Sequence, residues 1–170
     1  MTKLVGFIGG PCTGKTTLAE KVLYALQNKE YRAKWSREFL SDDIPVNGIP
    51  DLDYLIYEQY RICYHQHRIE EDAKNAADVV VTDCPLLICY IYALQQANKH
   101  LKGRQEHLLK EFNRFIAQDK NRYQHLYLLT RESVYEDNAI RFHSLEESIE
   151  MDELIQNTLD RHNIPYTILS

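Results

Sequence analysis

The sequence lacks any long apolar run, and this absence bears on where the protein can work. A membrane-spanning helix needs about 18 or more consecutive apolar residues. No segment of the 170-residue chain approaches that length. The first residues, MTKLVGF, place one lysine before a short apolar run that a glycine interrupts. We therefore expect neither association with a membrane nor a signal peptide.

Cysteine is scarce and follows no recognisable pattern. The four cysteines, Cys12, Cys63, Cys84 and Cys89, contain no CxxC pair and have no companion histidine at the spacing of a zinc finger. Zinc sites and disulfide frameworks are both read from regular spacing of this kind. We expect free thiols in a reducing compartment, and hence a cytoplasmic protein.

Positive charge is in deficit, since the net charge is −5 and the isoelectric point is near 5.8. A broad nucleic-acid-binding face usually requires clustered lysine and arginine, so the acidic balance disfavours one, while a small basic cleft stays open. The chain also has no internal repeat and no linker rich in proline, glycine or serine. Its length is typical of one domain, and we expect a single domain over residues 1–170.

Glycine is rare as well, yet three of the six glycines fall in the stretch GGPCTGKTT, residues 9–17. This stretch fits G-x-x-x-x-G-K-[ST] with Gly9, Gly14, Lys15 and Thr16, between a predicted strand and a predicted helix. Such a loop turns its backbone N–H groups, and the positive end of the helix, toward phosphate oxygens. Lys15 is expected to reach the β- and γ-phosphates, and the Thr16 hydroxyl to bind Mg²⁺. The residues expected around the nucleotide phosphates are Gly9, Pro11, Cys12, Thr13, Gly14, Lys15, Thr16 and Thr17.

Apolar runs of strand length alternate with amphipathic helical segments along the chain. The pattern predicts strands over Lys3–Gly9, Tyr31–Ser36, Asp78–Asp83, His125–Leu129 and Ile164–Leu169. It predicts helices over Lys15–Asn28, Asp51–Ala77, Leu86–Asn98 and Arg104–Asp119, and from a capping box at Ser144 to about His162. The segment Asp42–Pro50, with two prolines and a glycine, is predicted to be a loop. Alternation of this kind favours an α/β fold with a parallel sheet covered on both faces.

An acidic residue follows the apolar run DVVVTD, which places Asp83 at the carboxyl end of a buried strand. Ligands of open α/β sheets bind at that edge. An acid there holds the metal ion in P-loop enzymes, as the Walker B acid does. Asp83 is therefore the second predicted metal-binding residue, with a turn or helix-capping role as the alternative.

Three classes of P-loop protein compete for this pattern. A hexameric AAA+ motor usually needs a longer chain with a separate helical lid, and a GTPase switch normally carries an N/T-K-x-D motif, which this sequence lacks. A small-molecule kinase fits the length. Arg131 and Arg141 follow the fourth predicted strand, and we expect a lid at about residues 131–145 whose arginines neutralise charge on the transferred phosphoryl group. Ordinary arginines on a solvated helix are the alternative.

A kinase also needs a group that orients and deprotonates the attacking hydroxyl. The second predicted strand ends in SREF, so Glu38 is the candidate base and acceptor ligand, and Arg37 is the candidate contact to an acceptor phosphate. A surface ion pair is the alternative for these two residues. Gln59, and less so Gln66, interrupts the apolar stripe of the Asp51–Ala77 helix and is a candidate acceptor-binding residue, with a packing role as the alternative.

Taken together, these motifs resemble the nicotinamide riboside kinase-like family of small P-loop kinase domains, an AAA-type ATPase/kinase group with phage members. The resemblance rests on GGPCTGKTTLAEKV, WSREFL, YEQYR, VVVTDCPLL, YEDNAIR and IPYTIL, and so covers nearly the whole chain. It pairs Asp137 with Arg141 in a D-x-x-x-R lid pattern. It implies the three-layer P-loop kinase fold, with a five-stranded parallel sheet in the order 2-3-1-4-5.

The resemblance implies ATP and Mg²⁺ as cofactors and a small nucleoside- or nucleotide-like molecule as the phosphate acceptor. The loop Ser41–Pro50 and the segment Gln95–Gln105 depart from the riboside kinase pattern, so the resemblance does not determine the identity of the acceptor. One alternative is a kinase acting on hydroxymethylated pyrimidines within DNA, as in phage relatives. A second alternative is an NTP-binding regulator without an acceptor. The sequence does not fix the oligomeric state, and a homodimer stays open.

Overall fold

A parallel β-sheet forms the centre of the molecule in the computed structural model, which describes residues 2–47, 55–100, 106–131 and 145–169. Within these residues the strands are β1 (Lys3–Ile8), β2 (Ala33–Ser36), β3 (Val79–Thr82), β4 (His125–Leu129) and β5 (Thr167–Leu169). Their order is β2-β3-β1-β4-β5, and every pairing is parallel. The five-stranded sheet and the order that the resemblance implied are confirmed.

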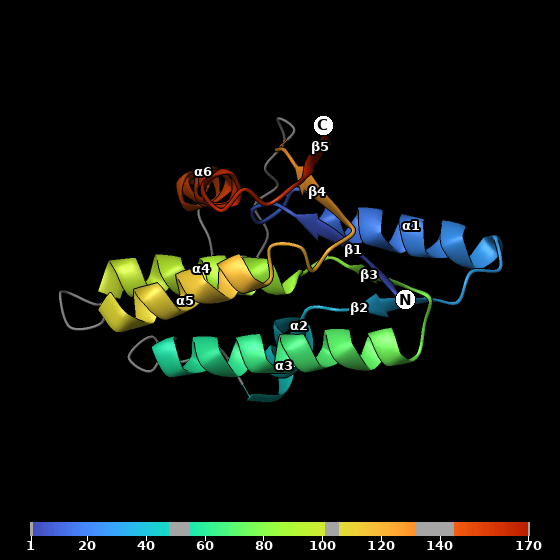
Figure 1. The fold of residues 1–170 in the computed structure, drawn as a ribbon, viewed down its shortest axis with the longest axis horizontal. Helices are drawn as coiled ribbons and strands as arrows, with labels where there is room; N and C mark the ends of the chain where they lie inside the picture. Colours follow the sequence, from blue (N-terminus) through green and yellow to red (C-terminus); the bar gives the residue numbers. More distant parts are fainter. Residues whose placement is uncertain (1, 48–54, 101–105, 132–144, 170) are drawn as a thin grey trace.

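Helices cover both faces of this sheet (Figure 1). They are α1 (Lys15–Asn28), α2 (Phe39–Asn47), α3 (Leu55–Asn75), α4 (Leu86–His100), α5 (Glu106–Gln118) and α6 (Leu145–Arg161). Helix α1 lies against one face, while α3, α4, α5 and α6 pack together on the other. None of the described helices is both long and apolar enough to cross a membrane.

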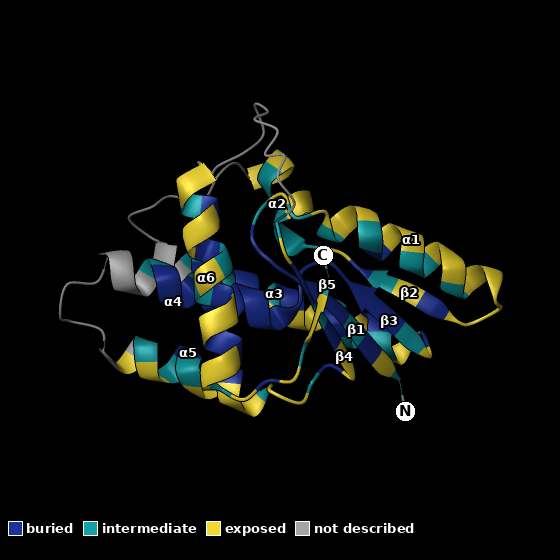
Figure 2. Cartoon of the chain, turned by 90° about the horizontal axis from the view of Figure 1, so that it is seen from above, coloured by how far each residue is buried: buried dark blue, intermediate teal, exposed yellow. Residues whose placement is uncertain are grey.

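The alternation of side chains along β1 divides the core into two parts. Leu4 and Ile8 point into the larger cluster, which is shared with α3, α4, α5 and α6. Phe7 points to the opposite face and packs with Ala19 of α1 in a smaller cluster. This division follows from the two-residue period of a strand, and Figure 2 shows the buried strands between the exposed outer faces of the helices.

The predicted loop at Asp42–Pro50 is wrong over its first part, because residues 39–47 form α2, with Pro45 inside it; residues 48–50 lie outside the described part of the chain. Proline removes one intrahelical hydrogen bond, and contacts from α3 hold this helix. The buried Asp43 carboxylate accepts hydrogen bonds from Arg61 at 3.0 and 2.7 Å, and from Asn47 at 2.8 Å. The sequence pattern showed the helix-breaking Pro45, but it could not show that Arg61 on another helix would bind Asp43.

The carboxyl ends of β1, β2, β3 and β4 meet at one edge of the sheet because all four strands are parallel. The phosphate loop follows β1, Glu38 follows β2, Asp83 follows β3, and Arg131 follows β4. Four segments that are far apart in the sequence are thereby brought to the edge where open α/β sheets bind ligands.

Candidate active site

The phosphate loop connects β1 to α1, and side chains at its end form hydrogen bonds to the backbone near its start. Gly14 precedes the first helical residue with a φ of 82°, a left-handed conformation that favours glycine. The Lys15 ammonium donates a hydrogen bond to the carbonyl oxygen of Gly10 at 2.6 Å, and the Thr13 hydroxyl donates to the same oxygen at 3.1 Å. The ammonium therefore lies against the loop backbone at Gly10.

Carboxylates gather around the Lys15 ammonium. Burial lowers the pKa of Lys15 below its ordinary value, and the negative charges of Glu38, Asp83 and Asp152 partly offset this effect. A cation that has lost much of its water interacts more strongly with an incoming anion. Lys15 thus lies within electrostatic range of three carboxyl groups.

Asp83 is buried directly below Thr16, as the strand pattern predicts. The Thr16 hydroxyl donates to one carboxylate oxygen of Asp83 at 2.7 Å. The indole N–H of Trp35 on β2 donates to the other carboxylate oxygen at 2.9 Å. Hydrogen bonds from Thr16 and Trp35 therefore fix the orientation of both oxygens of this buried carboxylate.

The Thr16–Asp83 pair has the chemistry of a magnesium site. Mg²⁺ prefers oxygen ligands, and it is usually bound by one or two protein side chains together with water and substrate phosphates. The two side chains present a hydroxyl oxygen and a carboxylate oxygen at hydrogen-bond distance beside the loop. No group of three or more His, Cys, Asp or Glu side chains suited to a metal occurs among the described residues. The pair therefore fits an ion shared with a nucleotide.

Glu38 lies between β2 and α2, in surroundings that favour the protonated form of its carboxyl group. Burial raises the pKa of its carboxyl group, the Ser41 hydroxyl and Lys15 act in the opposite direction, and Asp83 adds to the rise. The Ser41 hydroxyl donates to Glu38 Oε2 at 3.0 Å. Glu38 and Asp83 are thus close enough for their charges to influence each other at the same sheet edge.

The other predicted acceptor residues occupy different environments. Arg37 is largely exposed, lies 5.2 Å from the centre of the Trp35 ring and comes within 3.9 Å of the Asp42 carboxylate. Gln59 is buried on α3, and the structure gives it no hydrogen bond to another described residue of the site. Gln66 is fully buried and bound to backbone, since it accepts from the Phe39 N–H at 2.9 Å and donates to the Arg37 carbonyl at 3.2 Å. These backbone contacts favour the packing alternative for Gln66.

The predicted lid falls largely outside the described residues, which resume at Leu145, so the predictions for Asp137, Arg141 and Ser144 concern residues that the structure does not describe. Arg131 is described, and it is held by α6. Its Nε donates to Asp152 Oδ2 at 3.0 Å, while Asp152 Oδ1 accepts the Gly10 N–H at 2.8 Å.

Three residues near the site were missed from the sequence. Trp35 contacts the predicted residue Asp83, and Asp152 contacts the predicted residue Arg131. Tyr92 on α4 is the third, and the pKa of its phenol is raised by burial and by nearby charges that include Glu38 and Asp152. Trp35 lies in β2, near the carboxyl end of the strand that precedes Glu38, and this position was a usable signal. Asp152 and Tyr92 carry no local signal, because only the packing of α6 and α4 brings them near.

The strand order and the loop after β1 define a domain with the P-loop kinase fold. The chain belongs to a family described as AAA domain, whose model matches residues 4–170. No significant match was found among curated protein sequences. The family description names a type of domain and no reaction, so any proposal about the chemistry rests on the geometry of the site.

Solved structures with the same fold include kinases and a larger nucleotide-binding protein. A NadR protein in complex with NAD and AMP-PNP superposes with a TM-score of 0.68 at 19% identity, over 99% of this chain and 44% of that chain. A thymidylate kinase from Ehrlichia chaffeensis gives 0.61 at 13% identity, over 99% and 86%. A thymidylate kinase from Candida albicans gives 0.64 at 15% identity, over 99% and 83%. The chain thus spans less than half of the NadR protein and most of each thymidylate kinase.

Proposed function

We propose that this protein is an ATP- and Mg²⁺-dependent kinase that transfers the γ-phosphoryl group to a hydroxyl of a small nucleoside- or nucleotide-like acceptor. Lys15 and the loop amides bind the phosphates of ATP. Thr16 and Asp83 hold the magnesium ion, and Glu38 orients the acceptor hydroxyl. Arg131, together with Arg141 from the predicted lid, neutralises charge on the phosphoryl group.

The position of Glu38 carries this proposal. A protein that only binds a nucleotide needs the loop, the lysine and a metal ligand, which Lys15, Thr16 and Asp83 supply. Glu38 is an additional carboxyl group at the same edge, and the charges of Lys15 and Asp83 both act on it. A general base in this place supports transfer to an acceptor hydroxyl over a purely regulatory role.

The proposed reaction is a direct in-line transfer. The acceptor oxygen forms a bond to the γ-phosphorus while the bond from that phosphorus to the β,γ-bridging oxygen breaks, and ADP leaves. Glu38 takes the proton of the acceptor hydroxyl. Lys15 stabilises negative charge on the bridging and γ-phosphate oxygens, so positioning and electrostatics supply most of the rate enhancement.

When bound, the magnesium ion would neutralise charge on the β- and γ-phosphates. Thr16 and Asp83 are the residues that would hold it, and Trp35 fixes the orientation of the Asp83 carboxylate through its second oxygen.

The surroundings of Glu38 favour a small acceptor over DNA. A DNA acceptor would favour free cations beside the site, and Arg61 lies over the Phe39 ring next to Glu38. Its guanidinium is bound by the carboxylates of Asp43 and Glu58, both at 2.7 Å. The NadR protein and the thymidylate kinases of similar fold support ribosides and nucleoside monophosphates as the first acceptors to test.

The test is a screen for ATP-dependent phosphorylation, read by mass spectrometry of the acceptor. Ribosides, nucleosides, nucleoside monophosphates and DNA containing hydroxymethylated pyrimidines are offered separately. We expect a mass increase of one phosphoryl group on a small acceptor. Phosphorylation of the DNA alone would establish the alternative acceptor, and ATP hydrolysis with no phosphorylated acceptor would favour the regulator.

Variants connect the activity to the site. Glu38→Gln is expected to lower transfer about 100-fold or more while ATP binding is retained, since general base catalysis contributes about 10²–10⁴-fold. Glu20→Gln on the exposed surface of α1 is the matched control and should behave like the wild type. Equal transfer by the wild type and the Glu38 variant would contradict the role of this residue.

A further inference from the structure

The two carboxylate oxygens of Asp152 bind two different parts of the site. Asp152 Oδ1 accepts the N–H of Gly10 in the phosphate loop at 2.8 Å. Asp152 Oδ2 accepts the Nε–H of Arg131 at the end of β4 at 3.0 Å. One side chain on α6 thus connects the loop that follows β1 to the arginine that follows β4.

The close approach of α6 requires glycine at position 10. A Cβ atom on Gly10 would collide with the Asp152 carboxylate and lie 3.1 Å from the carbonyl oxygen of Ser148, one turn earlier on α6. Because Gly10 has no side chain, the Asp152 carboxylate can reach the backbone N–H of the loop.

The peptide groups around Gly10 form a junction between Asp152 and Lys15. The N–H of Gly10 is held by Asp152, and its carbonyl oxygen accepts from Lys15 Nζ at 2.6 Å and from Thr13 Oγ1 at 3.1 Å. A shift of the Gly10 backbone would therefore move the acceptor to which Lys15 is bound. Asp152 is the only described side chain that holds this N–H, so it fixes the junction from outside the loop.

Arg131 depends on Asp152 for its orientation. Its side chain is 14% exposed, and Nη2 also lies 3.0 Å from Asp152 Oδ2. Neither Nη1 nor Nη2, both buried, makes a hydrogen bond of good geometry to a described residue. A guanidinium has five N–H donors, so Arg131 keeps donors that an anion could accept while Asp152 holds its other edge.

We propose that Asp152 is a positioning residue, which holds the phosphate loop and Arg131 in fixed relation so that both can contact the phosphates of one nucleotide. This inference rests on the proposed function and adds to it a residue that no sequence motif identified. Asp152 itself does not touch the phosphates. It acts through the Gly10 peptide and the Arg131 guanidinium.

The opposite charges of Asp152 and Arg131 predict how a variant that lacks both should behave. A carboxylate beside a phosphate-binding loop repels ATP unless a cation compensates it, and Arg131 compensates Asp152. Removing Arg131 alone leaves an unpaired negative charge at the loop. Removing both charges relieves that repulsion, so the double variant should bind a nucleotide more tightly than the Arg131 variant.

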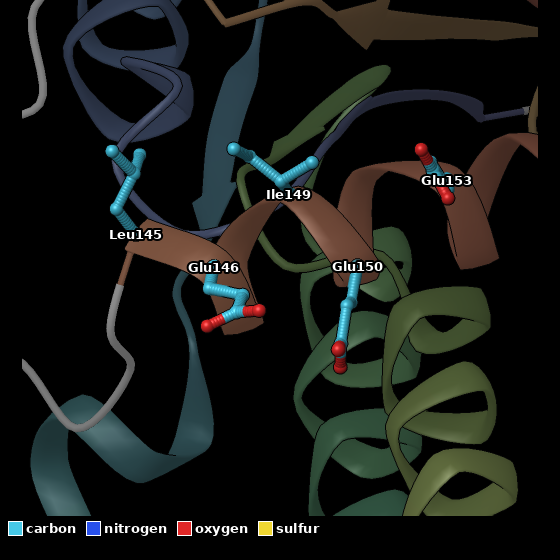
Figure 3. A pocket seen from close by; sticks show the side chains of 5 residues that line it. All are labelled: Leu145, Glu146, Ile149, Glu150 and Glu153. Atoms are coloured by element: carbon cyan, nitrogen blue, oxygen red, sulfur yellow. The ribbon is translucent and has the colours of Figure 1, made fainter.

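The experiment measures binding of a non-hydrolysable ATP analogue with Mg²⁺ by calorimetry, for the wild type, Asp152→Asn, Arg131→Gln and the double variant. We expect Kd to rise about 10-fold in Arg131→Gln, about 3- to 10-fold in Asp152→Asn, and less in the double variant than in Arg131→Gln, because residues in direct contact are not additive. Glu153→Gln, the neighbouring exposed acid on α6 (Figure 3), is the control and should match the wild type.

A second measurement does not depend on nucleotide binding. The amide proton of Gly10 donates to a carboxylate, so its NMR resonance should lie downfield in the wild type and move upfield in Asp152→Asn, with no change in Glu153→Gln. If the Asp152 variant fails to fold, Arg131→Gln still tests the proposal, since it should bind the analogue more weakly while its Gly10 resonance stays downfield.

Three results would overturn the proposal: unchanged Kd values in the single variants, additive losses in the double variant, or a Gly10 resonance that ignores Asp152. A lower melting temperature with unchanged Kd would also overturn it, because that result assigns Asp152 to stability alone. The assay contains no acceptor. A wild type that binds the analogue and phosphorylates nothing would therefore contradict the proposed function and leave this inference intact.

Discussion

Gln66 and Glu70 lie one helical turn apart on α3, and each satisfies the first backbone N–H of another helix. Gln66 accepts from Phe39 at the start of α2 at 2.9 Å, and Glu70 accepts from Leu86 at the start of α4 at 3.0 Å. The first N–H groups of a helix have no partner within it. Because α2 and α4 directly follow the segments that carry the two site carboxylates, α3 sets the position of both.

This arrangement predicts the effect of Gln66→Ala. The substitution removes the Gln66 partner of the part-buried Phe39 N–H and Arg37 carbonyl, and each unsatisfied group costs up to about 1–3 kcal/mol when water does not reach it. We expect the free energy of unfolding, measured in urea, to fall by about that amount or more. Phosphoryl transfer should fall further than ATP binding, because the loosened segment carries Glu38.

The control for this variant is Gln118→Ala at the exposed end of α5, which should leave both quantities near their wild-type values. A Gln66 variant whose affinity for the acceptor falls while its stability is unchanged would instead assign Gln66 to the acceptor.

The raised pKa of Glu38 predicts a pH dependence of activity. A general base must be deprotonated, so the ratio kcat/KM should fall as the pH drops through the pKa of Glu38, which burial places above 4.5. In Glu38→Gln the ratio should be low throughout, and this acidic limb should disappear. A wild-type profile that is flat down to pH 4.5 would contradict the assignment.

The same group predicts a change in stability with pH. Because the pKa is higher in the folded state than in the unfolded chain, the folded state binds more protons between the two values, and stability falls as the pH rises through this window. Urea unfolding at several pH values should show a smaller fall in Glu38→Gln than in the wild type.

The parts of the site that the sequence predicts are those carried by local patterns. The phosphate loop has a fixed spacing between a strand and a helix, and Asp83 and Glu38 each follow a strand. The parallel sheet then brings these ends to one edge, so their proximity follows from fold class alone. The roles of Lys15, Thr16, Asp83, Glu38 and Arg37 stay predictions until they are tested in solution.

The parts that the sequence could not predict depend on contacts between distant segments. Asp152 reaches Gly10 across 142 positions of the chain, and no periodicity encodes that approach. Residues 39–47 form a helix whose Asp43 binds Arg61 of α3, a contact that the local sequence does not reveal. Gln66 looked like a polar residue on an apolar stripe, and only the fold shows that its partners are backbone groups.

Trp35 gives a direct optical probe of the predicted metal site. It is the single tryptophan of the chain, and its indole N–H donates to Asp83. Binding of Mg²⁺ and ATP at the Asp83 carboxylate should change the environment of this indole. We expect a saturable change in intrinsic fluorescence when Mg²⁺ and ATP are added together, and a much smaller change in Asp83→Asn.

Trp35→Phe should abolish the fluorescence signal and retain ATP binding measured by another method. An emission spectrum of the wild type that is insensitive to saturating Mg²⁺ and ATP would argue that the nucleotide and its ion bind away from Asp83.

Calorimetric titration of a non-hydrolysable ATP analogue with Mg²⁺ into the wild type, Lys15→Ala and Lys21→Ala tests the central claim most directly. Lys21 is exposed on α1 and serves as the charge-matched control. A hydrogen bond to a charged group contributes about 1.5–3 kcal/mol, so Lys15→Ala should raise Kd about 10- to 150-fold while Lys21→Ala leaves it unchanged. Equal affinity in all three proteins, or no binding by the wild type, would contradict the account.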